Sequence, residues 1–143
     1  MKNKLTIEYN HESNFDHYVP SENHFLDCIN KTSTFLSKSL DAYFITVSFV
    51  KMASLNSYHR KKQGATNVLS FPESSDCVTG TVYFCPKVIE DENSNSPSYW
   101  SLMIVHSLLH LAGYTHDNDI DAEVMESSET KIIANLLPEY KDD

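Results

Sequence analysis

Apolar and polar residues alternate near the start of the chain, where Leu5, Ile7 and Tyr9 are separated by single polar positions. This period of two predicts a short half-buried strand. Later segments are rich in β-branched and aromatic residues, which favour strands. The further strands are expected at residues 43–50, 66–71 and 80–84, and we expect the last two to pair across a turn at residues 73–76.

A second pattern, with apolar residues three and four positions apart, predicts helices. Capping residues set their ends: Ser96 can cap free N–H groups, Pro97 suits the first helical position, and Gly113 suits a helix stop. Helices are expected at about residues 21–39, at 52–60, from Ser96 to Gly113, and from residues 117–119 to Pro138. In the last of these, the residues expected to face inward are Ile120, Val124, Ile132, Ile133, Leu136 and Leu137.

Composition narrows the class of protein. The chain has 143 residues, of which 41% are hydrophobic and only 8 are Gly or Pro, which excludes collagen-like and wholly disordered chains. We therefore expect one domain over residues 1–143. Its three cysteines have no C-x-x-C spacing, which indicates neither a disulfide framework nor a thiolate zinc site. With no apolar stretch of signal or membrane-spanning length, we expect a cytoplasmic protein.

The formal net charge of −9 argues against a generic basic nucleic-acid binder, and DNA is not expected as a partner. The charges are unevenly placed, however. Residues 51–72 hold Lys51, Arg60, Lys61 and Lys62 and no acid, whereas residues 73–143 hold 3 bases and 14 acids. An anionic ligand should therefore bind near Arg60, which is the sole arginine.

Three histidines have the spacing of a metal site. His106 and His110 lie four residues apart, so a helix would place both on one face. Gly113 can turn the chain so that His116 supplies a third nitrogen. Three imidazoles with an open fourth position are typical of catalytic zinc. The other histidines lack such spacing and are expected at the surface: His11, His17, His24 and His59.

The spacing is that of the metzincin peptidases, H-E-x-x-H-x-x-G-x-x-H, with one difference. Position 107 is Ser, whereas a peptidase needs a glutamate there as general base. A peptidase reaction is therefore disfavoured.

Two blocks of sequence resemble the YbeY-type endoribonucleases, a family of bacterial ribosomal RNA maturation factors. The first runs from Leu55-Asn56 through Arg60 to the stretch T-N-V-L-S-F-P at residues 66–72. The second runs from His106 to His116 and is followed by Met125, Glu126 and Glu129. With the order of strands and helices, the likeness spans about residues 43–137.

The resemblance implies a single-strand-specific, metal-dependent endoribonuclease that matures the 3′ end of 16S ribosomal RNA and takes part in ribosome quality control. It implies a zinc ion on His106, His110 and His116, with nickel as a rival that imidazole nitrogens also suit. It implies a functional arginine at Arg60, where the charge pattern independently places an anion. Arg60 and His106 are thus the expected catalytic residues, and precursor ribosomal RNA and the small ribosomal subunit are the expected partners.

Four positions depart from the family pattern. Ser107 replaces a glycine, Ala65 a proline, and Thr81 and Thr115 replace aspartates that could orient metal ligands. A non-catalytic, metal-stabilised ribosome-assembly factor therefore stays open as an alternative. Asn67 and Ser70 could contact RNA, whereas Val68, Leu69 and Phe71 are expected in the core.

The acidic residues after His116 are expected to form a solvated helix face, with Asp117 as the one candidate partner for a metal ligand; the set is Asp117, Asp119, Asp121, Glu123, Glu126 and Glu129. Taken together, the patterns predict an α+β fold. We expect a small mixed β-sheet packed against helices, with the metal site on the penultimate helix and the loop that follows it.

Overall fold

A computed structural model describes residues 2–10, 15–73, 77–92 and 95–141. Its centre is a four-stranded sheet in the order β1-β2-β4-β3. The strands are β1 (Lys4–Asn10), β2 (Leu40–Val47), β3 (Val68–Glu73) and β4 (Val78–Phe84). β1, β2 and β4 run parallel, and β3 pairs with β4 in the antiparallel sense. The predicted mixed sheet and the predicted pairing of its last two strands are confirmed.

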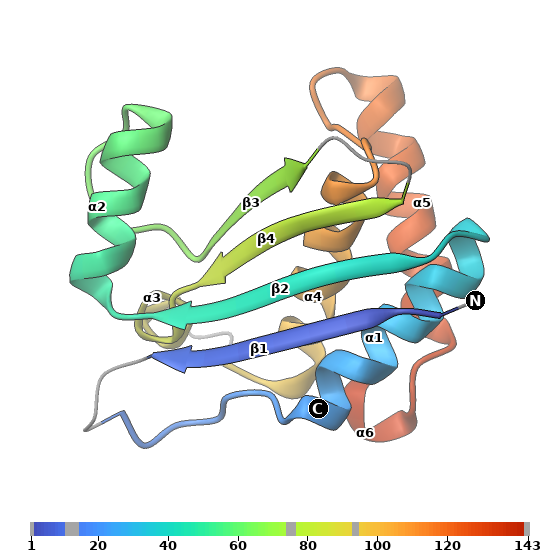
Figure 1. Cartoon of the computed structure of the whole chain (residues 1–143), viewed down its shortest axis with the longest axis horizontal. Helices are drawn as coiled ribbons and strands as arrows, with labels where there is room; N and C mark the ends of the chain where they lie inside the picture. The colour runs from blue at the N-terminus through green and yellow to red at the C-terminus, as the bar shows by residue number, and fades with distance from the viewer. Residues whose placement is uncertain (1, 11–14, 74–76, 93–94, 142–143) are drawn as a thin grey trace.

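Helices α1 (Glu22–Leu36), α4 (Pro97–Leu111) and α5 (Asp119–Ala134) lie on one side of the sheet (Figure 1). We call this side the core face. Alternate residues of β2 and β4 point into it, and α4 contributes the fully buried Trp100, Ile104 and Leu108. The main hydrophobic core therefore lies between the sheet and α4, the helix that carries two of the three histidines.

The opposite side, which we call the α2 face, is covered only at one end of the sheet. Helix α2 (Phe49–Arg60) stands there (Figure 1). Its Met52 joins Val47, Leu69 and Cys85 in a second buried cluster, and Phe71 packs against them. This cluster fixes α2 against β3, an edge strand of the sheet.

Capping explains where most helices begin. Ser21, Ser48, Ser96 and Asn118 each accept a hydrogen bond from a backbone N–H in the first turn of α1, α2, α4 and α5. Ser48 also explains one wrong prediction: β2 ends at Val47 because the cap begins α2 at Phe49, which overrides the strand-like composition of residues 43–50.

Two short helices were not predicted: α3 (Pro86–Asp91) and α6 (Pro138–Lys141). Because α6 follows α5, the helix with the histidines is the third from the end rather than the penultimate one. The helix expected to run to Pro138 instead ends at Ala134, and the turn expected at residues 73–76 lies largely outside the described residues.

The inward face predicted for the last long helix is only partly correct. Ile120, Val124 and Leu137 are exposed. The buried stripe of α5 is narrow and contains Met125, Ser128, Glu129 and Ile132, so the first turns of the helix contribute little to the core.

His24, expected at the surface, is fully buried. Its Nε2 lies 2.6 Å from the Ser101 hydroxyl, and that hydroxyl donates to the Tyr140 carbonyl at 2.5 Å. The hydrogen of Ser101 is thus used, so His24 donates from Nε2, and its Nδ1 accepts from the Tyr18 hydroxyl at 2.6 Å. This chain joins the segment before α1 to α4 and α6. Among the described residues, no helix is long and apolar enough to span a membrane.

Candidate metal centre and cleft

The histidine cluster, which we define as His106, His110 and His116, is assembled by α4 and the turn after it. The helix puts His106 and His110 on one face, one turn apart. Gly113 then adopts a left-handed conformation with φ of 98°, and the N–H of Tyr114 bonds back to the Leu109 carbonyl. The chain therefore doubles back and places His116 beside the two helical histidines.

Nitrogen atoms from all three rings lie within 4.8 Å of one another, so the set could hold a metal ion. The Nε2 atoms of His106 and His110 are 3.0 Å apart, and the ring of His116 lies 5.5 Å and 5.1 Å from the other two ring centres. The third nitrogen predicted from the Gly113 turn is thus where the sequence analysis expected it.

The other ring nitrogens of two histidines are held by acceptors. His110 donates from Nδ1 to the Tyr114 carbonyl at 2.9 Å, because a carbonyl can only accept. The Nδ1 of His106 lies 2.5 Å from the carboxylate of Glu129, which also accepts. When both rings are neutral, each Nε2 carries a lone pair, and the two Nε2 atoms face each other. This arrangement fits a bound cation, because two facing acceptors repel each other when nothing lies between them.

Burial lowers the pKa of His110 from its ordinary value, and the neighbouring His106 and His116 lower it further. The Tyr114 carbonyl and Glu129 act in the opposite direction, but burial dominates. The neutral imidazole, which is the form that binds metals, is therefore favoured at neutral pH.

A close approach at Gly80 sets the position of α4 on the sheet. A Cβ atom at this position would lie 2.5 Å from Cδ2 of Leu111 and 2.6 Å from the Phe71 carbonyl oxygen. Only glycine allows Leu111, at the end of α4, to pack this closely. The histidine cluster is thereby brought next to β3.

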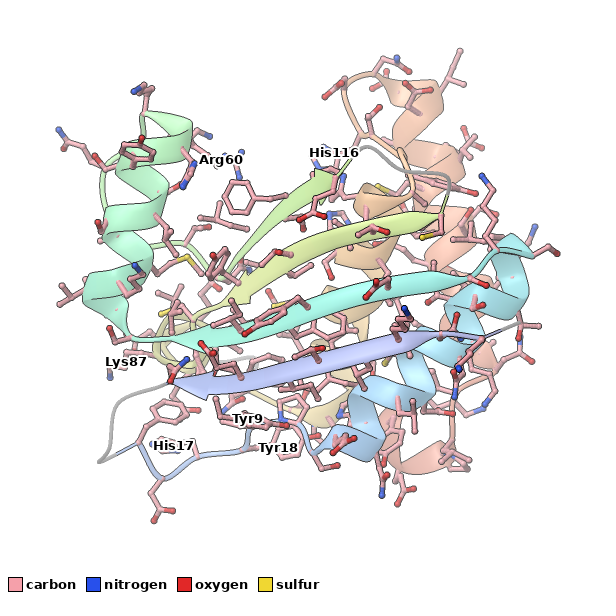
Figure 2. All side chains as sticks on the ribbon, viewed as in Figure 1. Tyr9, His17, Tyr18, Arg60, Lys87 and His116 are labelled. Atoms are coloured by element: carbon pink, nitrogen blue, oxygen red, sulfur yellow. The ribbon has the colours of Figure 1, made fainter. Side chains whose placement is uncertain are left out.

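The cluster borders a cleft of about 640 Å³. Thr66, Asn67, Val68, Ser70 and Pro72 line one wall, the histidines and residues 113–117 line another, and Arg60 also contributes. Figure 2 shows Arg60 on α2 and His116 near the tip of β3. The sole arginine and the histidine cluster, separated in the sequence by 45 residues, thus share one cleft.

Arg60 is the last residue of α2, and the loop after it is tied to the helix. Lys61 takes a left-handed conformation with φ of 57°, and the N–H of Lys62 bonds to the Asn56 carbonyl. The buried Asn56 side chain also donates to the Gly64 carbonyl at 2.9 Å. Asn56, noticed in the sequence only as part of the family-like block, therefore holds the segment that carries Arg60 and leads to β3.

Several other predictions can be compared with this geometry. Asn67, Ser70 and Asp117 line the cleft. Val68, expected in the core, is half-buried and lines it as well. Lys61 and Lys62, which could contact the RNA backbone or form a solvated helix end, are exposed and are not among the lining residues.

The departures from the family pattern have different surroundings. Ser107 is fully buried, and its hydroxyl donates to the Ile104 carbonyl at 2.7 Å, so it could not serve as a base in the cleft. Thr81 alternates with the core-facing Gly80 and Val82 and thus lies on the α2 face, where it cannot orient the histidines. Thr115 does line the cleft and donates to Asp121 at 3.2 Å.

Glu129 is the residue that the sequence analysis missed. It was expected on a solvated helix face, but it is only 9% exposed and holds His106. The one available signal was its helical spacing from Met125, since residues four apart share a face. Glu129, Glu126, His106 and His116 line a second hollow of about 490 Å³ on the other side of the cluster.

Comparison with known proteins gives one consistent family. The family model described as "Endoribonuclease YbeY" matches residues 7–137. A protein named endoribonuclease YbeY from Nitrosococcus oceani is 32% identical, over 82% of this chain and 84% of its own length. The protein of the same name from Blochmanniella floridana is 35% identical, over 82% of this chain and 83% of its own length. Among solved structures, the solution structure of TM1509 from Thermotoga maritima shares the fold, with a TM-score of 0.53, 24% identity, and coverage of 89% of this chain and 86% of that one.

Proposed function

Because the chain belongs to the endoribonuclease YbeY family, we propose that it is a metal-dependent endoribonuclease that cuts single-stranded RNA. The observation that carries this proposal is the shared cleft: the sole arginine and three converging histidines line one depression. Phosphodiester cleavage needs a cation-lined site that can hold the phosphate while charge builds on its oxygens. This cleft supplies a permanent cation in Arg60 and a candidate metal site in the three histidines.

The three histidines would hold one ion, through Nε2 in the case of His106 and His110. When bound, a divalent ion supplies a Lewis acid that can polarise a phosphoryl oxygen or lower the pKa of water to about 7. The all-imidazole donor set suits zinc, and it suits nickel as well. We propose zinc, held in an open site with three protein ligands.

Arg60 would bind the phosphate. Its guanidinium carries a permanent charge and can donate two parallel hydrogen bonds to phosphate oxygens, which lysine cannot do with the same geometry. Asn67 and Ser70, on the wall of the cleft that faces the histidines, offer polar groups to the sugar and backbone of the RNA. Glu129 would act through His106, by accepting from Nδ1 and so fixing the ring with Nε2 turned toward the site.

We further propose that the substrate is the precursor of 16S ribosomal RNA, cut near its 3′ end in the cytoplasm, and that the small ribosomal subunit presents it. The charge distribution supports the proposal that another molecule presents the RNA to the cleft. Outside residues 51–72, the chain carries 20 acids against 7 bases and would repel free RNA. Binding to naked RNA should therefore be weak and sensitive to salt.

The test is cleavage of a labelled single-stranded RNA by zinc-loaded protein, with Arg60→Ala and His110→Ala as variants. Lys87→Ala is the matched control, because it removes a positive charge on α3 that does not line the cleft. We expect both cleft variants to lose at least 100-fold in rate and the control to stay near wild type. Unchanged rates in both cleft variants would refute the assignment.

The alternative, a non-catalytic assembly factor, predicts a different result. The purified protein would bind small subunits and be stabilised by metal, yet it would cut no RNA under any metal condition.

A further inference from the structure

Aromatic rings run from the end of α2 onto β3, on the side of the sheet away from the histidine cluster. Tyr58 meets the ring of His59 edge-on, with ring centres 4.8 Å apart. His59 in turn lies 4.8 Å from the ring of Phe71 on β3. We call these three residues the ring row. Tyr58, at its outer end, is 74% exposed.

The burial of the ring row is uneven. Phe71 packs into the second buried cluster and contacts Tyr83 of β4 at 5.7 Å, so its place is explained by folding. Tyr58 gains little from folding, because most of its surface stays in water. A single exposed aromatic residue is ordinary in proteins. This one is held by a neighbouring ring, which limits its rotamers and leaves a large part of its surface free for a ligand.

The surroundings of Tyr58 are positively charged. Helix α2 contains no acidic residue, and Lys51 lies two helical turns before Tyr58 on the same stripe of the helix. Lys61 and Lys62 follow the helix directly and are exposed. Among the described strand residues, the acids on the α2 face are Glu8, Asp41 and Glu73; Asp41 and Glu73 both pair with Thr79 in register. Glu73 lies two residues, about 7 Å, from Phe71 on the same face of β3, which is the end of the ring row away from Tyr58.

The ring row is separated from the cleft only by strand β3. His59 precedes Arg60, and Phe71 lies between Ser70 and Pro72, which line the cleft from the opposite side of the same strand. β3 is an edge strand of the sheet and pairs only with β4, so the two faces of the sheet meet at its outer edge. A flat apolar ring beside cations and next to a phosphate-binding cleft matches a nucleotide chain, whose bases stack while its phosphates are paired with cations.

We propose that Tyr58, supported by His59 and Phe71, is a stacking subsite for one unpaired base of the RNA, next to the phosphate held at Arg60. The inference rests on the proposed function and deepens it, because it names a source of the single-strand requirement. A base inside a duplex is stacked and paired and cannot lie on this ring, whereas an unpaired base can. The row tolerates any base, since every base has a face to stack.

The experiment pairs a change in the protein with a change in the RNA. Steady-state cleavage is measured on a single-stranded RNA of about ten nucleotides and on a set in which each position in turn is abasic. The variants are Tyr58→Ala, which removes the ring, and Tyr58→Phe, which retains it. Val50→Ala is the matched control, because Val50 is an exposed apolar residue at the other end of α2.

We expect Tyr58→Ala to raise KM about 5- to 10-fold with little change in kcat, and Tyr58→Phe and Val50→Ala to stay within twofold of wild type. One abasic position should raise KM by a similar factor in wild type and have less than a twofold effect in Tyr58→Ala. If that position has the same effect in both proteins, or if none has an effect in wild type, the subsite is refuted.

Two further outcomes distinguish the base subsite from a protein-binding surface and from a failure of the proposed function. If Tyr58→Ala leaves KM for RNA unchanged but weakens binding to small subunits stripped of their RNA 3′ end, the ring row contacts a protein, and the base subsite is wrong. If wild type cuts no single-stranded RNA, the proposed function fails, and the subsite falls with it. Intact cleavage with no effect of Tyr58 refutes the subsite alone.

Discussion

The contact between Glu129 and His106 gives a prediction about metal affinity. Glu129 is almost fully buried, and its carboxylate lies 2.5 Å from Nδ1 of His106. A hydrogen bond to a charged acceptor contributes about 1.5–3 kcal/mol, and one between neutral groups about 0.5–1.5 kcal/mol. Glu129→Gln retains an acceptor and removes the charge, so it should cost roughly 1–2 kcal/mol of metal binding. This corresponds to a rise of about 5- to 30-fold in the Kd for zinc.

The assay is competition for zinc against a chromophoric chelator at pH 7.5, with far-ultraviolet circular dichroism to verify folding. Glu126→Gln is the matched control, because Glu126 lies one turn earlier on α5, is exposed, and lines the same second hollow. It should change the Kd less than twofold. If Glu129→Gln binds zinc as tightly as wild type, the carboxylate does not act on the metal site through His106. Equal losses in both variants would indicate a general effect of charge instead.

Two other predictions concern stability. Burial lowers the pKa of His24 to about 4, below about 6.5 in an unfolded chain. The unfolded state therefore binds more protons between these values. The contribution of His24 to the free energy of unfolding is complete above pH 6.5 and decreases as the pH is lowered, by about 2 kcal/mol between pH 7.5 and 5. Urea denaturation should show this loss in wild type and a smaller one in His24→Gln; equal losses would contradict it. Gly80→Ala places a Cβ atom 2.5 Å from Leu111 and 2.6 Å from the Phe71 carbonyl, so it should cost about 1–3 kcal/mol of stability and weaken zinc binding. Unchanged urea midpoint and Kd would show that α4 can shift freely.

Much of this fold could be predicted from local patterns. The α4 segment has a Ser-Pro start, a glycine stop and a strongly apolar sequence, and each signal agrees with the others. β1 followed from alternation alone. By contrast, Phe49 and Val50 have the composition of a strand, and the hydrogen bonds from the Lys51 and Met52 N–H groups to Ser48 assign them to α2. When a capping residue favours a helix and the composition favours a strand, the packing of the whole fold decides which of the two forms.

The histidine cluster followed from spacing, and an anion near Arg60 followed from the basic stretch, whereas their joint action at one site was implied only by the family resemblance. The buried partners did not follow from any of these. Glu129 and His24 are polar residues in polar stretches, and their burial depends on side chains that lie 23 and 77 residues away in the sequence. A single sequence does not show such long-range contacts. The wrong placement of Ile120 and Val124 has the same origin, because helical periodicity does not indicate where the surface that a helix packs against ends.

The claim that the histidine cluster and Arg60 form one RNA-cleaving centre is tested most directly by metal removal and return. One single-stranded RNA is incubated with protein that has been stripped by a chelator, and then with the same protein after one equivalent of zinc per chain is restored. The account predicts no cleavage by the stripped protein and full recovery at one equivalent. Full cleavage by the stripped protein, or none after zinc is bound, would contradict it.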